Sequence, residues 1–148
     1  MAGITEKVQN DMVAAMKARD RERLAALRML VSELRMGAKE AGGPFTEQQE
    51  TAVLRKEKKR RLQAAEAFRA GGREDRALKE EAEAGLIETY LPLEMGEEEL
   101  RALVDTAITE TGAAGPKDTG RVMSAVMARA GGRADGKTVS GMVRERLQ

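Results

Sequence analysis

The sequence predicts an all-α protein in two helical parts, and three observations support this fold class. Ala, Leu, Glu, Arg, Lys and Met dominate the chain, and these residues lose little side-chain freedom in a helix. Apolar residues recur at intervals of three and four between Gly and Pro breaks. β-Branched residues form no alternating run of the kind that indicates a strand. We therefore expect an elongated N-terminal helical hairpin or bundle over residues 1–94 and a small C-terminal three-helix bundle over residues 95–148.

Two helices are predicted before the first glycine-proline break. The first has an apolar residue at every fourth position: Ile4, Val8, Met12 and Met16. Asp20 is placed to cap the second helix. The expected buried face of that helix consists of Leu24, Leu27, Leu30, Val31 and Leu34.

Two more helices follow in the N-terminal part. Thr46 and Gln49 have the spacing of a capping box, which opens a third helix that ends near Gly71. Its expected apolar face is thin and consists of Val53, Leu54, Leu62, Ala65 and Phe68. The fourth helix must stop before Pro92, because the residue preceding a proline disfavours helical geometry. Its expected apolar stripe is Leu78, Ala82, Leu86 and Tyr90.

The C-terminal part contains three short apolar stripes. The first is Leu100, Leu103, Val104, Ala107 and Ile108; the second is Val122, Val126 and Ala130; the third is Val139, Met142, Val143 and Leu147. Glycines follow the first two helices at the C-cap position, and Asp135 is a suitable N-cap for the last. A three-helix bundle is the simplest arrangement that buries all three stripes.

Composition excludes several kinds of chemistry. The 148 residues include no Cys and no His. Disulfides, thiolate nucleophiles and Ser-His-Asp arrangements are therefore impossible, and a structural zinc site is not expected. We expect no catalytic residue, no cofactor and no metal. No export signal and no apolar run long enough to cross a membrane is visible, so we expect a cytoplasmic protein.

Basic residues gather near the C-terminus although the net charge is only +1. Residues 117–148 carry seven basic and three acidic side chains, giving 7 − 3 = +4. The candidates for phosphate contacts are Lys117, Arg121, Arg129, Arg133, Lys137 and Arg144. The turn over residues 131–136 could present backbone N–H groups to a phosphate at a helix start. The other interpretation is an ordinary solvated surface, with Asp135 as a cap.

A secondary basic patch lies in the predicted third helix. Its candidate RNA contacts are Arg55, Lys56, Lys59 and Arg60. The alternative is that this run pairs with the acidic fourth helix, which would place Arg60 or Arg61 near residues 78–83. The chain has only three aromatic residues, two Phe and one Tyr, too few for a platform on which single-stranded bases stack. Any bound RNA is therefore expected to be folded and recognised by shape and backbone.

Five stretches in order resemble the stand-alone YqeY-like proteins of the GatB/YqeY family. They are residues 24–30, residues 54–61, residues 70–75 with 79–83 and 90–92, residues 110–112 with 117–123, and residues 132–137 with Val139 and Val143. This resemblance covers essentially the whole chain. It implies an all-helical module shared with the C-terminal tail of the B subunit of bacterial aspartyl/glutamyl-tRNA amidotransferase. In that enzyme the tail contacts tRNA and the chemistry lies elsewhere.

Three functions follow from the residues and the resemblance together. The first is a non-catalytic module that binds tRNA or another folded RNA, with an aminoacyl-tRNA enzyme or an amidotransferase as a further partner. The second is a protein–protein adaptor acting on a translation-related or metabolic enzyme. The third is a carbon–nitrogen ligase activity, which rests only on a label that the family can carry. The sequence speaks against the third, because it has no glycine-rich nucleotide loop of the G-x-x-x-x-G-K-[ST] type.

Overall fold

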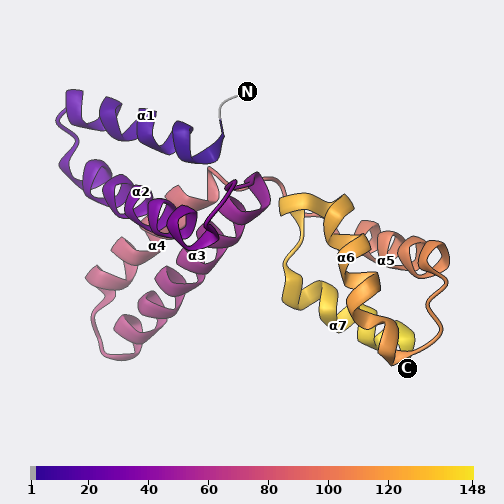
Figure 1. Cartoon of the computed structure of the whole chain (residues 1–148). Helices are drawn as coiled ribbons and strands as arrows, with labels where there is room; N and C mark the ends of the chain where they lie inside the picture. Colours follow the sequence, from indigo (N-terminus) through magenta and orange to yellow (C-terminus); the bar gives the residue numbers. More distant parts are fainter. Residues whose placement is uncertain (1–2) are drawn as a thin grey trace. The chain divides into compact units, whose positions relative to one another are not determined.

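The protein is all-α, as predicted. The computed structural model describes residues 3–148, and within that range it contains seven α-helices, two short 3-10 helices and no strand (Figure 1). The elements are α1 (Ile4–Lys17), α2 (Arg21–Ala41), α3 (Glu47–Ala70), α4 (Glu74–Glu88), α5 (Glu97–Thr111), η1 (Pro116–Asp118), α6 (Thr119–Ala130), η2 (Gly131–Arg133) and α7 (Gly136–Leu147).

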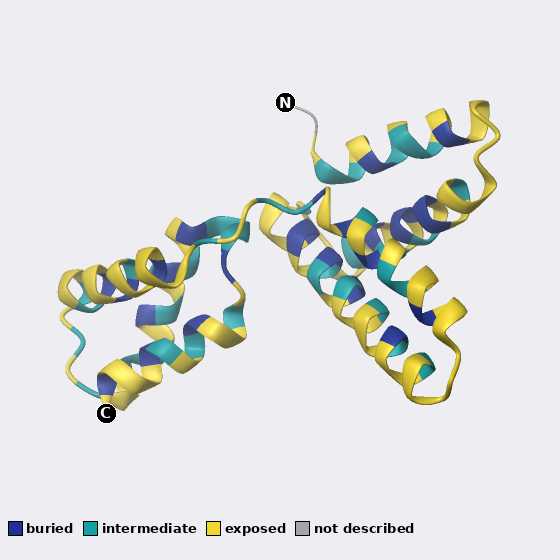
Figure 2. Ribbon diagram, turned by 180° about the vertical axis from the view of Figure 1, so that it is seen from behind, coloured by how far each residue is buried: buried dark blue, intermediate teal, exposed yellow. Residues whose placement is uncertain are grey.

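The chain divides into two compact units, each with its own hydrophobic core. Unit 1 is Met1–Leu91 and unit 2 is Pro92–Gln148. Figure 2 shows the buried residues of each helix on the side that faces its neighbours, with exposed residues on the opposite side. The core of unit 1 is built on Val8, Leu27, Leu30, Leu34, Leu54 and Ile87. The core of unit 2 is built on Leu100, Val104, Val122, Val126, Val139 and Val143.

Unit 1 consists of two helix pairs, α1 with α2 and α3 with α4 (Figure 1). The predicted caps form here. The Asp20 carboxylate accepts a hydrogen bond from Arg23 N at 3.2 Å at the start of α2. Thr46 and Gln49 make the reciprocal bonds of a capping box at the start of α3, at 3.2 and 2.9 Å. These local bonds satisfy N–H groups that a helix start leaves without an intrahelical acceptor.

Helix α1 is held by side chains from other helices as well as by its apolar face. The buried Glu50 carboxylate of α3 accepts hydrogen bonds from Thr5 N at 2.6 Å and Thr5 Oγ1 at 2.5 Å. The Tyr90 hydroxyl donates to Asp11 Oδ2 at 2.5 Å, and Lys7 Nζ lies 5.7 Å from the centre of the Tyr90 ring. Glu50 therefore satisfies part of the N-terminus of α1, where no side-chain cap of its own is present.

Four residues of the predicted apolar faces of unit 1, Met16, Leu62, Leu78 and Ala82, are exposed, and this part of the prediction is wrong. Met16 is half exposed, and Ala15 is buried in its place. Leu62 of α3 is 46% exposed and Leu78 of α4 is 56% exposed. The buried face of α4 instead comprises Ala77, Ala84, Ile87 and the following Tyr90. Small alanines take the inward positions because α4 lies along α3 over nearly its whole length (Figure 1).

The contact between α2 and α3 depends on Gly37. A Cβ atom at this position would lie 2.9 Å from Val53 Cγ2 and 3.2 Å from Phe45 Cζ. The first distance is shorter than real Cβ contacts, so the two helices are already at the closest approach that a residue without a side chain permits. The pairing of Gly37 with Val53, and of Met29 with Arg61 further along, shows that α2 and α3 run antiparallel.

Unit 2 is a bundle of α5, α6 and α7 around the three predicted stripes. Helix α5 ends at Gly112, whose φ of 67° is the left-handed conformation that glycine adopts without strain. Asp135 caps α7, as predicted, with its carboxylate accepting from Thr138 N at 3.2 Å. Only the short η2 and two further residues connect α6 to α7, so these two packed helices are antiparallel and the C-terminal half of α7 lies beside η1.

Candidate nucleic-acid interface

The six candidate phosphate contacts lie on the second half of unit 2. Lys117 is on η1, Arg121 and Arg129 are on α6, Arg133 is on η2, and Lys137 and Arg144 are on α7. Helical spacing and the short connection between α6 and α7 bring them to one bundle. They do not form one uniform basic surface, because the ion pairs divide them into two groups.

Two arginines of α6 are held by carboxylates. Arg121 Nη2 lies 3.0 Å from Asp118 Oδ1, and Arg129 forms an ion pair with Glu110 of α5. A hydrogen bond from Ala114 N–H lowers the pKa of Asp118, and the charge of Arg121 lowers it further. Asp118 therefore remains ionised well into the acid range and keeps Arg121 compensated. Neither arginine presents a full positive charge to a phosphate.

Arg133 has a structural task. Its Nε donates to the backbone oxygen of Leu93 at 3.0 Å, and its two terminal nitrogens reach Glu99 at 3.3 and 3.2 Å. Its own backbone oxygen accepts from Met95 N at 2.8 Å. These bonds tie η2 to the segment that leads into α5 and to the first turn of that helix. Arg133 therefore links η2 to the start of α5, and it is also a charged residue at the surface of unit 2.

The turn at residues 131–136 presents a carboxylate at the start of α7. The Asp135 side chain accepts from both Thr138 N and Thr138 Oγ1, at 3.2 and 3.1 Å. A helix start that is already occupied by an acidic cap has lost part of its attraction for a phosphate. The interpretation of Asp135 as a cap is therefore confirmed, and its carboxylate offsets part of the positive potential at the start of α7.

Three of the six candidates form no ion pair in the described part of the chain, although the charge of Lys117 contributes to lowering the pKa of Asp118. Within residues 3–148, Lys117, Lys137 and Arg144 are exposed and form no ion pair. Lys137 and Arg144 are seven residues apart on α7 and therefore lie on the same helix face. Lys117 is on η1, which packs against α7. Lys137 and Arg144 thus place two positive charges without an ion-pair partner along one edge of α7.

Two further arginines of unit 2 were missed by the sequence prediction. Arg101 of α5 and Arg146 of α7 line a cleft of about 320 Å³ with Val104, Met142 and Glu145. Arg101 is paired with Glu97 at 2.6 Å, and Arg146 with Asp105 at 3.2 Å. The i, i+4 spacing of Glu97 and Arg101 is a local signal that could have identified one pair. The pair formed by Asp105 and Arg146 joins distant parts of the chain and has no such signal.

The secondary patch of α3 is also divided. Lys56 and Lys59 are exposed and form no ion pair in the described part of the chain, whereas Arg60 lies 2.9 Å from the buried carboxylate of Glu57. Arg55 is half-buried. The patch therefore contributes two exposed lysines that form no ion pair in the described part of the chain.

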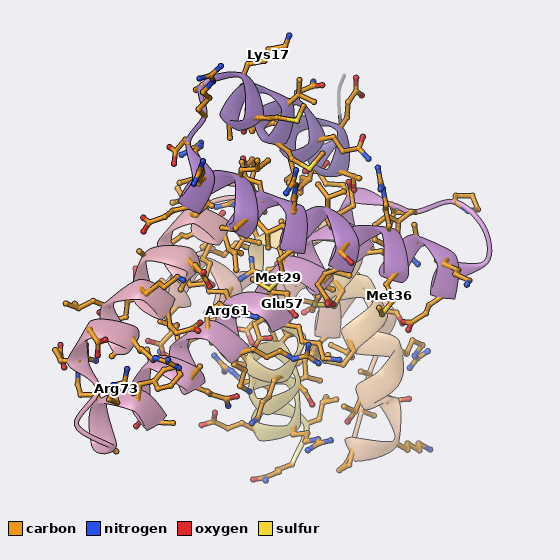
Figure 3. All side chains as sticks on the ribbon, turned by 90° about the vertical axis from the view of Figure 1, so that its left-hand side faces the viewer. Lys17, Met29, Met36, Glu57, Arg61 and Arg73 are labelled. Atoms are coloured by element: carbon orange, nitrogen blue, oxygen red, sulfur yellow. The ribbon has the colours of Figure 1, made fainter. Side chains whose placement is uncertain are left out.

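Arg61, next to this patch, joins three helices. Its guanidinium lies 3.2 Å from Glu80, 3.4 Å from Glu83 and 3.5 Å from Glu57, and its Nη2 is 3.3 Å from the sulfur of Met29. Figure 3 shows Met29, Glu57 and Arg61 gathered at the centre of unit 1. The predicted pairing between the basic run and residues 78–83 is therefore present at Arg61, together with a second link from Lys58 to Glu88 at 3.6 Å.

The described residues contain neither a metal-type cluster nor a helix suited to a bilayer. Within residues 3–148 no three His, Cys, Asp or Glu side chains are grouped so that they could hold a metal ion. None of the helices in that range is both long enough and apolar enough to cross a membrane.

Comparison with known proteins gives a match over nearly the whole chain. A family model described as Yqey-like protein matches residues 5–147. A relative from Pyrenophora tritici-repentis, named Altered inheritance of mitochondria protein 41, mitochondrial, is 30% identical over 146 residues. That alignment covers 96% of this chain and 80% of the relative.

Proposed function

The chain belongs to the YqeY-like family, and on this premise we propose that it is a non-catalytic module that binds tRNA or a similarly folded RNA through unit 2. The observation that supports the proposal is the edge of α7, where Lys137 and Arg144 carry positive charge without a compensating carboxylate. Lys117 lies on η1, which packs against α7, and is a further exposed cation of unit 2. Exposed cations of this kind neutralise phosphates and release counterions.

The distribution of aromatic residues favours a folded RNA. Phe45, Phe68 and Tyr90 are the only aromatic residues of the chain, and all three lie in unit 1. Tyr90 is buried and hydrogen-bonded to Asp11. Unit 2 therefore has no ring on which an unpaired base could stack, and its contacts with RNA would be to the phosphates and sugars of a preformed shape.

The experiment is a titration of fluorescently labelled tRNA, followed by anisotropy at several salt concentrations. The test variant carries Lys137→Ala with Arg144→Ala, and its matched control carries Arg121→Ala with Arg129→Ala. Each phosphate contact that is lost lowers the slope of log K against log salt by roughly 0.7–0.9, so the test variant should lose roughly 1.4–1.8. In the control variant this slope should change much less, because Arg121 and Arg129 are already paired with carboxylates.

Two results would overturn the proposal. One is the absence of binding at low salt, about 50 mM, where phosphate contacts are strongest. The other is an equal loss of tRNA affinity in the test and control variants. Such a result would show that RNA binding depends on the net charge of the protein and not on the edge of α7. Folding of each variant is checked by circular dichroism.

A complementary variant tests the same surface by gain of binding. Glu110→Gln removes the partner of Arg129 and should tighten tRNA binding and steepen its salt dependence by up to about one phosphate contact. Glu88→Gln removes an equivalent partner from Lys58 in unit 1 and is the matched control. Equal effects of the two variants would contradict a site in unit 2.

The second candidate function is a protein–protein adaptor that docks on an aminoacyl-tRNA enzyme, an amidotransferase or a metabolic enzyme. Exposed apolar side chains of unit 1, Leu62 and Leu78 among them, favour it. Loss of RNA binding in the titration together with retention of a purified enzyme partner on the immobilised chain would select this function. Glutamine-dependent ammonia release by the purified chain would instead select the carbon–nitrogen ligase.

We place the proposed activity in the cytoplasm, a reducing compartment compatible with a chain without cysteines. The name of the fungal relative assigns that protein to mitochondria. A fluorescent fusion of this chain in its own host distinguishes the two compartments.

A further inference from the structure

A groove between α2 and α3 of unit 1 has no role in the proposed RNA contact. It has a volume of about 260 Å³. Its α2 wall consists of Glu33, Met36, Gly37 and Glu40, and its α3 wall consists of Val53, Lys56, Glu57 and Arg60. Met36, at the edge of this groove, is 52% exposed.

The two helices that form the walls of the groove are already in close contact at Gly37. Gly37 already brings α2 so near to α3 that an added Cβ would lie 2.9 Å from Val53. Within one chain, Met36 and part of Val53 therefore remain in contact with solvent along this groove. An occupant from outside the chain is needed to remove this surface from water.

The two walls of the groove have opposite charge. Glu33 and Glu40 lie seven residues apart on the same side of α2, and neither forms an ion pair within residues 3–148. On the other wall, Lys56 has no ion pair in that range, and Arg60 gives one nitrogen to Glu57. A partner that matches the groove must therefore carry a basic row and an acidic row side by side.

The chain itself carries such a pair of rows, and we propose that the groove is an interface between two copies of this chain. A twofold axis that runs along the groove places the acidic wall of one copy over the basic wall of the other. An axis across the groove would instead set acid against acid. The charges therefore select the first arrangement, which also covers Met36 in both copies.

The antiparallel register of α2 and α3 identifies the contact that matters most. Met29 lies beside Arg61, and Gly37 beside Val53, so Glu33 is at the same height along the groove as Glu57 and its neighbour Lys56. Because rotation about an axis along the groove leaves this height unchanged, Glu33 faces Lys56 of the second copy. The symmetry forms this ion pair twice.

Sedimentation velocity of the full chain at increasing concentration tests the proposal. The wild-type protein should form dimers by roughly 300 µM at low salt, a range that detects association with Kd near 1 mM or tighter. Glu33→Lys and Lys56→Glu should each weaken dimerisation at least tenfold, because like charges then face each other twice. Glu22→Lys and Lys59→Glu change charges on the same helices outside the groove and should leave dimerisation unchanged.

Mixing the two groove variants gives the sharpest result. An equimolar mixture of Glu33→Lys with Lys56→Glu restores two attractive pairs and should recover dimers of wild-type stability. Failure of the mixture to dimerise, a monomeric wild-type protein at the highest concentration, or equal dissociation in the two control variants would overturn the proposal. No RNA is present in this experiment, so its outcome is independent of the proposed function.

Discussion

Replacing Arg61 with methionine should destabilise unit 1 far more than the same change at an exposed arginine. Arg61 is only 21% exposed and faces the carboxylates of Glu57, Glu80 and Glu83. Burial acts to lower the pKa of Arg61, and the carboxylate of Glu80 in particular raises it, so that the pKa is raised overall. The guanidinium is therefore charged at any ordinary pH. Methionine keeps much of the side-chain length and removes the charge.

The size of the effect follows from what the substitution leaves behind. Three carboxylates, one of them in the buried Glu57, lose their shared cation. Removing one partner of a buried ion pair costs 3–5 kcal/mol, and the remaining exposure of Arg61 argues for the lower end, about 3 kcal/mol. Unit 1, residues 1–91, has an expected stability of about 5–14 kcal/mol. The variant should therefore fold, with a urea midpoint lowered by roughly 1–3 M.

The assay uses a natural probe of unit 1. Tyr90 is the only tyrosine, the chain has no tryptophan, and Tyr90 is buried in the core of unit 1. Urea unfolding followed by tyrosine fluorescence therefore reports unit 1 alone. Arg69→Met is the matched control: Arg69 is on the same helix and also contacts two glutamates, but it is 44% exposed. Its midpoint should move much less, because water screens exposed pairs.

The pH dependence provides a second check. Burial raises the pKa of Glu83, and the charge of Glu80 raises it further. A carboxyl group with a raised pKa in the folded state stabilises the fold below its unfolded pKa, and this contribution is lost as pH rises through the folded pKa. Without Arg61 the pKa of Glu83 should rise more, so the stability deficit of Arg61→Met should shrink between pH 7 and about pH 5. Equal midpoint shifts for the two variants, or a deficit that does not change with pH, would refute the reasoning.

Three further predictions concern unit 1. Gly37→Ala should lower its free energy of unfolding by about 1–3 kcal/mol in the tyrosine-monitored assay, because the new Cβ overlaps Val53; an unchanged midpoint would contradict this. Glu50→Gln should speed amide exchange in residues 4–17, where the carboxylate now holds Thr5, and leave unit 2 unchanged; uniform exchange rates would exclude such a local role. Burial and a hydrogen bond to a carboxylate raise the pKa of Tyr90, so its stabilising contribution is complete below the usual pKa of 10 and is lost as pH rises through the folded value; tyrosinate absorbance should therefore appear together with alkaline unfolding, not before it.

Sequence reasoning predicted the helices well because their ends are set by local chemistry. Asp20, Thr46 with Gln49, and Asp135 each bond an N–H group within three residues, and all were identified from spacing alone. Gly112 ends α5 by adopting a conformation that other residues adopt only with strain. An interaction whose partners lie within four residues of each other in the sequence can be predicted without knowledge of the fold.

The orientation of α3 and α4 was less predictable. Leu62 and Leu78 fit an apolar stripe at helical spacing, yet the structure turns both outward and buries Ala77 and Ala84. Helix α4 has a weak amphipathic pattern, so its rotation is decided by contacts with α3 and by the ion pairs of Arg61. Such contacts join residues about twenty positions apart, and no local pattern specifies them.

In the candidate site, too, local features can be predicted from the sequence, whereas contacts between distant parts of the chain cannot. Lys137 and Arg144 lie on one face of α7 because they are seven residues apart on a helix, which is a local relationship. The pairing of Arg129 with Glu110 and of Arg133 with Glu99 depends on how α5 packs against the helices that follow. A count of basic residues therefore overestimated the positive charge available to a ligand, and only the folded arrangement separates the two groups.

The alanines that line α4 carry an evolutionary consequence. Among related chains, ordinary intuition expects leucines to be retained and alanines to vary. Here Ala65, Ala77 and Ala84 are almost fully buried between closely packed helices, where each added methylene has a steric cost. Leu62 and Leu78 face outward and can change without opening a cavity. Selection for the fold alone should thus hold the smallest side chains of this hairpin constant and leave its outward-facing leucines free to drift.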